Sequence, residues 1–78
     1  MDKSIPLTYL PIGKKAKVKN LTADSASRRR LLDFGLISDT EIEALQESPS
    51  GNLTAYYIRG TVIALRAEES SKIFVEAL

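Results

Sequence analysis

The sequence contains no cysteine and no histidine. Without these two residues the chain lacks disulfides, a thiolate nucleophile and the usual ligands of zinc and other transition metals. It also lacks the side chain that most often performs acid–base chemistry near neutral pH. No serine or lysine has an evident activating base nearby in the sequence. We therefore expect no catalytic activity, no catalytic residues and no bound cofactor.

Long apolar runs are also absent. No stretch approaches the roughly 20 apolar residues that a membrane-spanning helix needs, and the first residues lack the basic-then-apolar pattern of a signal peptide. The chain has 78 residues, of which 44% are hydrophobic, enough for one small core. We expect residues 1–78 to form a single cytoplasmic domain that does not insert into a membrane.

The net charge of +1 conceals an uneven distribution along the chain. Residues 1–38 hold eight Lys or Arg and three acids, whereas residues 39–78 hold three and seven. The basic half includes Arg28, Arg29 and Arg30, which could bind nucleic-acid phosphates. Three consecutive helical positions spread over about 200°, however, and cannot follow one phosphate track. No exposed aromatics accompany them for base stacking, so a solvated or protein-facing surface is favoured.

Five short segments alternate or cluster apolar residues in the manner of strands: residues 15–21, 40–46, 53–59, 61–66 and 73–76. Turn signals separate them, and closing such a sheet removes its edges, which indicates an all-β, SH3-like five-stranded barrel. The phase change at Leu45 predicts a bulge, and Arg59-Gly60 predicts a two-residue hairpin turn. Residues 62–65 are continuously apolar, so we expect that strand to be covered on both faces.

One inserted helix is predicted over residues 25–34, and residues 67–72 are long enough for one further helical turn. Asp24 or Ser25 can cap the longer helix. Gly35 follows it at a position that commonly needs a left-handed backbone.

The apolar face of this helix contains Leu31 and Leu32. We expect both leucines to face the core and to plug one open end of the barrel. The other residues expected to have structural roles are Gly13, Gly35, Leu36, Gly60 and Leu65.

Two further features suggest contact with a partner. The loop at residues 47–52 is the clearest in the chain and contains Pro49, Ser50, Gly51 and Asn52. Tyr57 points outward if its neighbours point inward, and exposed tyrosine is enriched in protein interfaces. Packing against a cross-strand neighbour explains Tyr57 equally well, and weak self-association is a third interpretation.

Several blocks, taken in order, resemble the FeoA domain: LPIGK at 10–14, RRLLDFGL at 29–36, IRG at 58–60, IALR at 63–66 and Ile73. The resemblance covers about residues 7–76. It implies a small cytosolic SH3-like accessory protein of bacterial ferrous iron uptake. The implied partner is FeoB, the membrane ferrous-iron transporter with a cytosolic GTP-binding domain, contacted on that domain or on its membrane part. The family is also described as transition-metal-binding, and its domain recurs at the C-terminus of iron- and manganese-dependent repressors.

The chain departs from the family pattern at two places. Ser38-Asp39 stands where Pro-Gly is usual, although it still favours a turn. In the central loop Ser50 replaces a large apolar residue, Asn52 an acidic one and Leu53 a proline. The candidate partner-binding residues are Arg28, Arg29, Arg30, Pro49, Ser50, Gly51, Asn52 and Tyr57.

Metal binding receives little support from the residues themselves. Carboxylates and backbone oxygens are the only ligands left, and they suit ferrous iron poorly. We assign no metal ligands and expect at most the weak divalent binding that the resemblance implies. The favoured function is a protein-interaction module for the FeoB-type transporter, and the main alternative is a stand-alone nucleic-acid-binding barrel. An iron-binding chaperone is a third hypothesis. A regulator's metal-sensing domain is disfavoured, because no DNA-binding helix-turn-helix precedes the domain.

Overall fold

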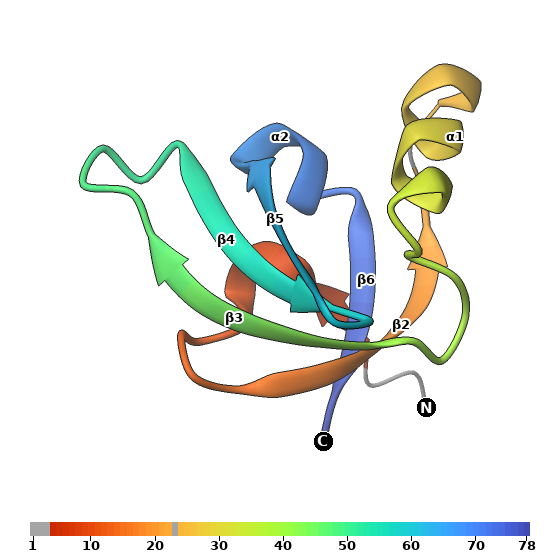
Figure 1. Ribbon diagram of the computed structural model, residues 1–78. Helices are drawn as coiled ribbons and strands as arrows, with labels where there is room; N and C mark the ends of the chain where they lie inside the picture. Colours follow the sequence, from red (N-terminus) through yellow and green to blue (C-terminus); the bar gives the residue numbers. More distant parts are fainter. Residues whose placement is uncertain (1–3, 23) are drawn as a thin grey trace.

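The computed structural model describes residues 4–22 and 24–78. Its main element is a six-stranded antiparallel sheet with the strand order β1-β6-β2-β3-β4-β5 (Figure 1). The strands are β1 (Ile5–Pro6), β2 (Lys15–Leu21), β3 (Glu41–Glu47), β4 (Leu53–Ile58), β5 (Thr61–Arg66) and β6 (Ile73–Ala77). The helices are the 3-10 helix η1 (Leu7–Tyr9), α1 (Ser25–Asp33) and α2 (Ala67–Ser70). None of the helices in these two ranges is long and apolar enough to span a bilayer.

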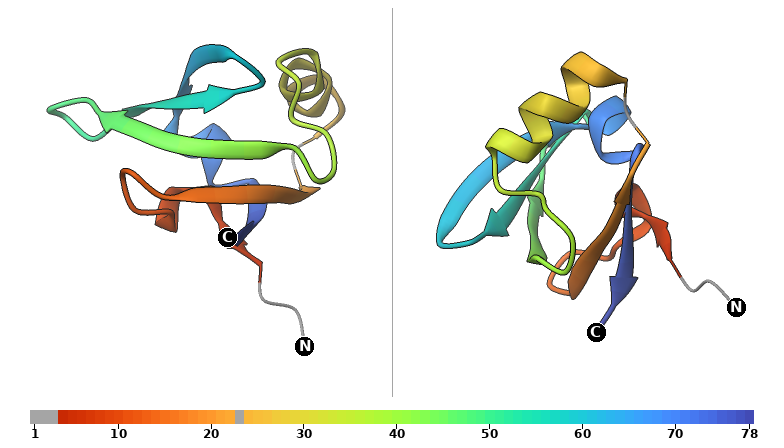
Figure 2. Two further views of the ribbon diagram at one scale, coloured as in Figure 1. Left: turned by 60° about the horizontal axis from the view of Figure 1, so that its bottom comes forward. Right: turned by 90° about the vertical axis from the view of Figure 1, so that its right-hand side faces the viewer.

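The sheet is strongly curved, so that its two ends approach each other around a common interior (Figure 2). Its terminal strands β1 and β5 are not paired with each other. The prediction of a small all-β fold with one inserted helix and a short C-terminal helical turn is confirmed. The sheet differs from the predicted barrel in having six strands and in remaining open between its terminal strands.

Alternating side chains from the strands fill the interior. In β2, Ala16 and Val18 are buried while Lys15 and Lys19 are exposed. The core also receives Leu7 and Leu10 from the segment that precedes β2. The complete set of buried apolar residues is Leu7, Leu10, Ala16, Val18, Leu21, Leu31, Leu36, Ile42, Ala44, Tyr56, Ile58, Leu65, Ile73 and Val75.

The strand absent from the prediction is β1. It contains only two residues, which pair with Val75 and Phe74 of β6. Pro6 suits an edge strand because it has no backbone N–H to donate. The strand was not predicted because two residues are too few to show an alternating pattern. The segment that follows β1 forms the 3-10 helix η1.

β5 is exposed on one face, so the prediction that residues 62–65 are covered on both faces is wrong. Val62 is 58% exposed, Ala64 is also exposed, and Leu65 is fully buried. The side chains of β5 alternate between the two faces of the sheet, as in other antiparallel strands. Its outward residues Val62 and Ala64 are apolar, however, so the sequence does not show which face is exposed.

α1 lies beside the curved sheet (Figures 1 and 2). Leu31 is 1% exposed, but Leu32 is 40% exposed, so the expectation that both leucines plug the barrel is wrong for Leu32. Consecutive helical residues point about 100° apart, and only one of the two can face the core. Leu36, in the segment after the helix, is fully buried.

The turns follow the sequence signals closely. Gly35 has a φ of +95° directly after the C-cap residue Phe34. Arg59 and Gly60 have φ values of +52° and +85°, and the residues that flank them pair directly. This is the geometry of a tight two-residue hairpin. Gly13 also has a positive φ, of +89°. The register of β3 with β4 shifts between Ala44 and Gln46, which confirms the predicted bulge.

Candidate protein-interaction surface

The outward side of the hairpin formed by β4 and β5 carries a contiguous apolar surface. Tyr57 pairs with Val62 and Ala55 pairs with Ala64 across the two strands. Leu53 and Tyr57 are 41% and 45% exposed. We call this surface the β4–β5 face and define it by Leu53, Ala55, Tyr57, Val62 and Ala64.

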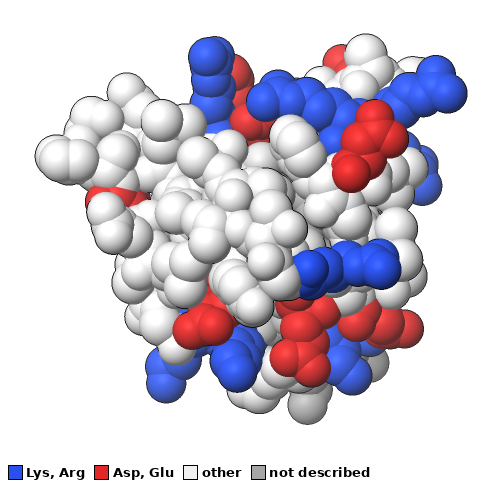
Figure 3. Space-filling view, in the orientation of Figure 1, with Lys and Arg blue, Asp and Glu red and all other residues white. Residues whose placement is uncertain are grey.

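Charged residues are sparse over this part of the molecule. In the space-filling view the central and left-hand surface, over β4, β5 and the β3–β4 connection, is almost entirely uncharged (Figure 3). Charged residues border the face. Glu43 of β3 lies opposite Tyr57, and Arg66 of β5 lies opposite Leu53. An apolar centre with a polar rim is the usual anatomy of a protein-binding surface.

The hairpin register explains why these side chains share one side. The direct pairing of Ile58 with Thr61 fixes the register, and side chains then alternate with a period of two. Tyr56, Ile58 and Leu65 consequently point into the core. Burial raises the pKa of the Tyr56 phenol above its usual value, whereas Tyr57 one residue later remains accessible.

The predicted loop lies at one end of the β4–β5 face. The Ser48 N–H donates to the Leu53 carbonyl at 2.8 Å, and the Leu53 N–H donates to Ser48 Oγ at 3.2 Å. The Gly51 N–H donates to the Ser48 carbonyl at 2.9 Å, so the loop is tied to itself and to the start of β4. A hollow of about 460 Å³ beside it is lined by Asn52, Leu53 and residues 66–68. The structure therefore places Pro49, Ser50, Gly51 and Asn52 next to the strand that carries Tyr57.

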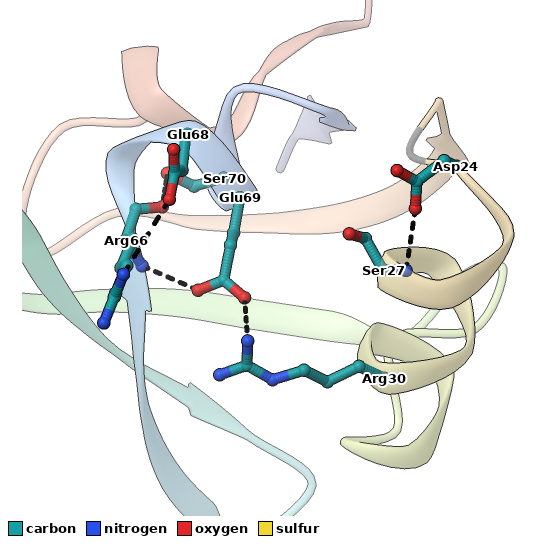
Figure 4. Close-up of polar contacts among 7 residues, drawn as sticks. All are labelled: Asp24, Ser27, Arg30, Arg66, Glu68, Glu69 and Ser70. Carbon is teal, nitrogen blue, oxygen red and sulfur yellow. Dashed lines mark hydrogen bonds and ion pairs between the residues drawn. The ribbon is translucent and has the colours of Figure 1, made fainter.

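The three arginines lie on α1, away from this loop (Figure 1). Arg30 Nη1 is 2.7 Å from Glu69 Oε2 of α2, and its guanidinium lies 5.5 Å from the centre of the Phe34 ring. Glu69 Oε1 also accepts a hydrogen bond from the Arg66 N–H at 3.0 Å (Figure 4). Arg30 thus links α1 to α2. Arg28 and Arg29 are exposed.

The basic N-terminal half of the sequence does not form a separate basic side. Lys15 lies opposite Glu43 and Lys17 lies opposite Glu41 in the pairing of β2 with β3. Lys19 Nζ is 2.8 Å from Asp39 Oδ1, and this contact raises the pKa of Lys19 and lowers that of Asp39. Folding therefore places acids of the second half beside lysines of the first.

Of the five residues that define the β4–β5 face, only Tyr57 was predicted from the sequence as a partner-binding residue. The alternation of β5 would reveal Val62 and Ala64 as outward residues only if they were polar. Instead, Val62 and Ala64 are as apolar as their inward neighbours Ile63 and Leu65.

Comparison with known proteins identifies the family. Residues 5–77 match the FeoA domain. The chain belongs to the FeoA family. The FeoA-like protein of Clostridium acetobutylicum is 36% identical, and the match covers all of this chain and 91% of that protein, with a TM-score of 0.90. The FeoA of Chlorobium tepidum is 31% identical over 95% of this chain and 70% of its own, with a TM-score of 0.89. No curated protein matches the sequence.

Another solved FeoA structure confirms the SH3-like character of the fold. The FeoA of Stenotrophomonas maltophilia, solved in complex with zinc, is described as a prokaryotic SH3 domain protein. It is 27% identical over 90% of this chain and 87% of that one, with a TM-score of 0.80. A manganese-dependent transcriptional repressor also shares the fold, with a TM-score of 0.90 at 18% identity.

This FeoA chain shows no cluster of metal-ligating side chains within residues 4–22 and 24–78. There, no group of three or more His, Cys, Asp or Glu side chains is arranged to hold a metal ion.

Proposed function

We propose that this FeoA protein is a non-catalytic cytoplasmic accessory protein of bacterial ferrous iron uptake. It acts by binding a FeoB-type transporter, and the β4–β5 face is the surface that makes the contact. Membership of the FeoA family supports the role in ferrous iron transport. The observation that carries the choice of surface is the exposure of Leu53, Tyr57 and Val62 on one side of a hairpin.

Burial of this face would provide the free energy of binding. Apolar surface removed from water contributes about 25 cal/mol per Å², and central aromatic residues often dominate such interfaces. Tyr57 is the aromatic residue on this face, and it lies opposite Val62 in the register of the hairpin. The loop at residues 48–52 extends the surface at the Leu53 end.

Two other hypotheses have less support. Nucleic-acid binding would need a continuous basic track, whereas the lysines of β2 lie opposite acids and Arg30 is paired with Glu69. An iron-binding chaperone would need a set of ligands close together, and the described residues offer no group of three.

The test is an NMR titration of the isotopically labelled protein, first with the GTP-binding domain of the transporter and then with the intact transporter in detergent. The domain is added with and without nucleotide. We expect saturable shifts at Leu53, Tyr57 and Val62 and in the loop. Shifts confined to α1, or none with either form of the transporter, would contradict the proposal.

A further inference from the structure

A second hollow lies on the opposite side of α1 from α2. It is formed by one face of α1, the outer part of β2 and the connection that follows α1, and its volume is about 140 Å³. Leu32 and Ile37 form its apolar walls, and Leu36 and Val18 lie at its base. We call it the α1 notch and define its lining by these four residues with Arg28 and Lys19.

Both walls of the notch are accessible. Leu32 is 40% exposed, although the sequence pattern predicted that it would face the core, and Ile37 is 46% exposed. Two large aliphatic side chains flanking one concave site can bind an apolar group, which a single exposed leucine on a flat surface cannot do. The volume of the notch is suited to one large apolar side chain.

The charge around the notch is positive. Arg28 lies one helical turn before Leu32, so the two side chains share a face of α1. Among the described residues, Arg28 makes no ion pair, whereas Lys19 is paired with Asp39. None of the side chains that line the notch is acidic. Arg28 is therefore the cation available to an acidic group placed beside the apolar walls.

We infer that the α1 notch binds an acidic peptide segment of a partner protein, with one large apolar side chain between the Leu32 and Ile37 walls. A carboxylate next to that side chain pairs with Arg28. A nucleic acid fits less well, because the notch offers one unpaired cation and no aromatic platform for a base. This inference concerns a surface separate from the β4–β5 face, and it does not depend on the identity of the transporter.

The first experiment uses the full chain, isotopically labelled, and a short synthetic peptide in which one leucine is flanked on both sides by glutamates. One control peptide has serine in place of the leucine, and another has lysines in place of the glutamates. We expect saturable NMR shifts at Arg28, Leu32 and Ile37 with the first peptide only. Absence of saturable shifts, or shifts that map to the β4–β5 face, would overturn the inference.

Charge variants separate the notch from general electrostatic attraction. Arg28→Glu should weaken binding of the acidic peptide about tenfold at low salt. Arg29→Glu is the matched control, because it makes the same charge change at an exposed neighbour that does not line the notch. It should weaken binding by about twofold or less. Equal losses in the two variants would overturn the inference.

A single-stranded oligonucleotide serves as the competing probe. Its binding at the notch should be weaker than that of the acidic peptide and should not depend on Leu32. Tighter oligonucleotide binding at the same resonances would assign the notch to nucleic acid and reject the peptide.

Discussion

Leu31 and Leu32 of α1 are neighbours in the chain but occupy different environments. Leu31 is 1% exposed and belongs to the core, whereas Leu32 is 40% exposed at the α1 notch. Truncating a buried leucine side chain to alanine loses the free energy of its transfer from water and leaves a cavity. Truncating an exposed leucine loses less transfer free energy and leaves no enclosed cavity.

Leu31→Ala should therefore lower the free energy of unfolding by about 2–5 kcal/mol, and Leu32→Ala by less than about 1 kcal/mol. Urea denaturation followed by circular dichroism measures both. A larger loss of unfolding free energy for Leu32→Ala than for Leu31→Ala would contradict the orientation of α1 in which Leu31 faces the core.

Gly35 combines two constraints in one residue. Its φ is +95°, and a Cβ added there would lie 3.0 Å from Cδ of Arg59. Gly35→Ala should cost about 1–2 kcal/mol from the backbone strain alone, with an added amount from the contact with Arg59. Gly13→Ala is the matched control, because its φ of +89° is similar and nothing lies within 4 Å.

Thermal or urea unfolding of the two alanine variants, each with and without Arg59→Ala, separates these contributions. The excess cost at Gly35 should disappear in the Arg59→Ala background, while the cost shared with Gly13 remains. An alanine at Gly35 with no effect on stability would contradict the strained backbone.

At the scale of the element, α1 is held by few contacts. Leu31 anchors it to the core, Arg30 links it to Glu69, and Asp24 caps its first turn. The Ser27 N–H donates to Asp24 Oδ1 at 2.9 Å, and this hydrogen bond lowers the pKa of Asp24 below its model-peptide value of 3.8 (Figure 4). The ionised carboxylate is thus the form that stabilises the folded helix.

The sign of the pH dependence follows from that lowered pKa. The cap contributes its full stabilisation of the folded state at pH values above 3.8, the pKa of Asp24 in the unfolded chain. This stabilisation is lost as the pH falls through the lower pKa that Asp24 has in the folded protein. Acidification to that range should lower the protection of the amides in the first turn of α1 against hydrogen exchange, measured relative to the intrinsic exchange rate at each pH. Asp24→Asn retains a capping oxygen without the charge, and its first turn should lack this pH step. An identical step in the variant would show that another group causes it.

At the scale of the molecule, antiparallel pairing determines how the charges are distributed. Lys15 and Lys17 of β2 pair with Glu43 and Glu41 of β3. The uneven charge of the two halves of the sequence therefore becomes a mixed surface. On the side of the molecule that Figure 3 shows, an uncharged area remains over β4 and β5.

The elements that could be predicted from the sequence are those in which polar and apolar residues alternate clearly. Lysines alternating with Ala16 and Val18 predict β2 with the bounds observed. β5 was also predicted with its observed bounds, but its accessible face was not, because Val62 and Ala64 are apolar on a solvent-facing side. The separation of the arginines of α1 from the loop at residues 48–52 depends on tertiary structure, which no local pattern encodes.

The most direct test of the account compares two exposed tyrosines in their effect on transporter binding. Tyr57 is 45% exposed on the β4–β5 face, and Tyr9 is 72% exposed on η1, outside that face. The Kd for the intact FeoB-type transporter is measured for the wild-type protein, Tyr57→Ala and Tyr9→Ala. We predict that Tyr57→Ala raises the Kd by about tenfold or more, equivalent to ~1.4 kcal/mol, while Tyr9→Ala changes it by less than about twofold. Equal effects of the two substitutions, or a larger effect of Tyr9→Ala, would contradict the β4–β5 face as the binding surface.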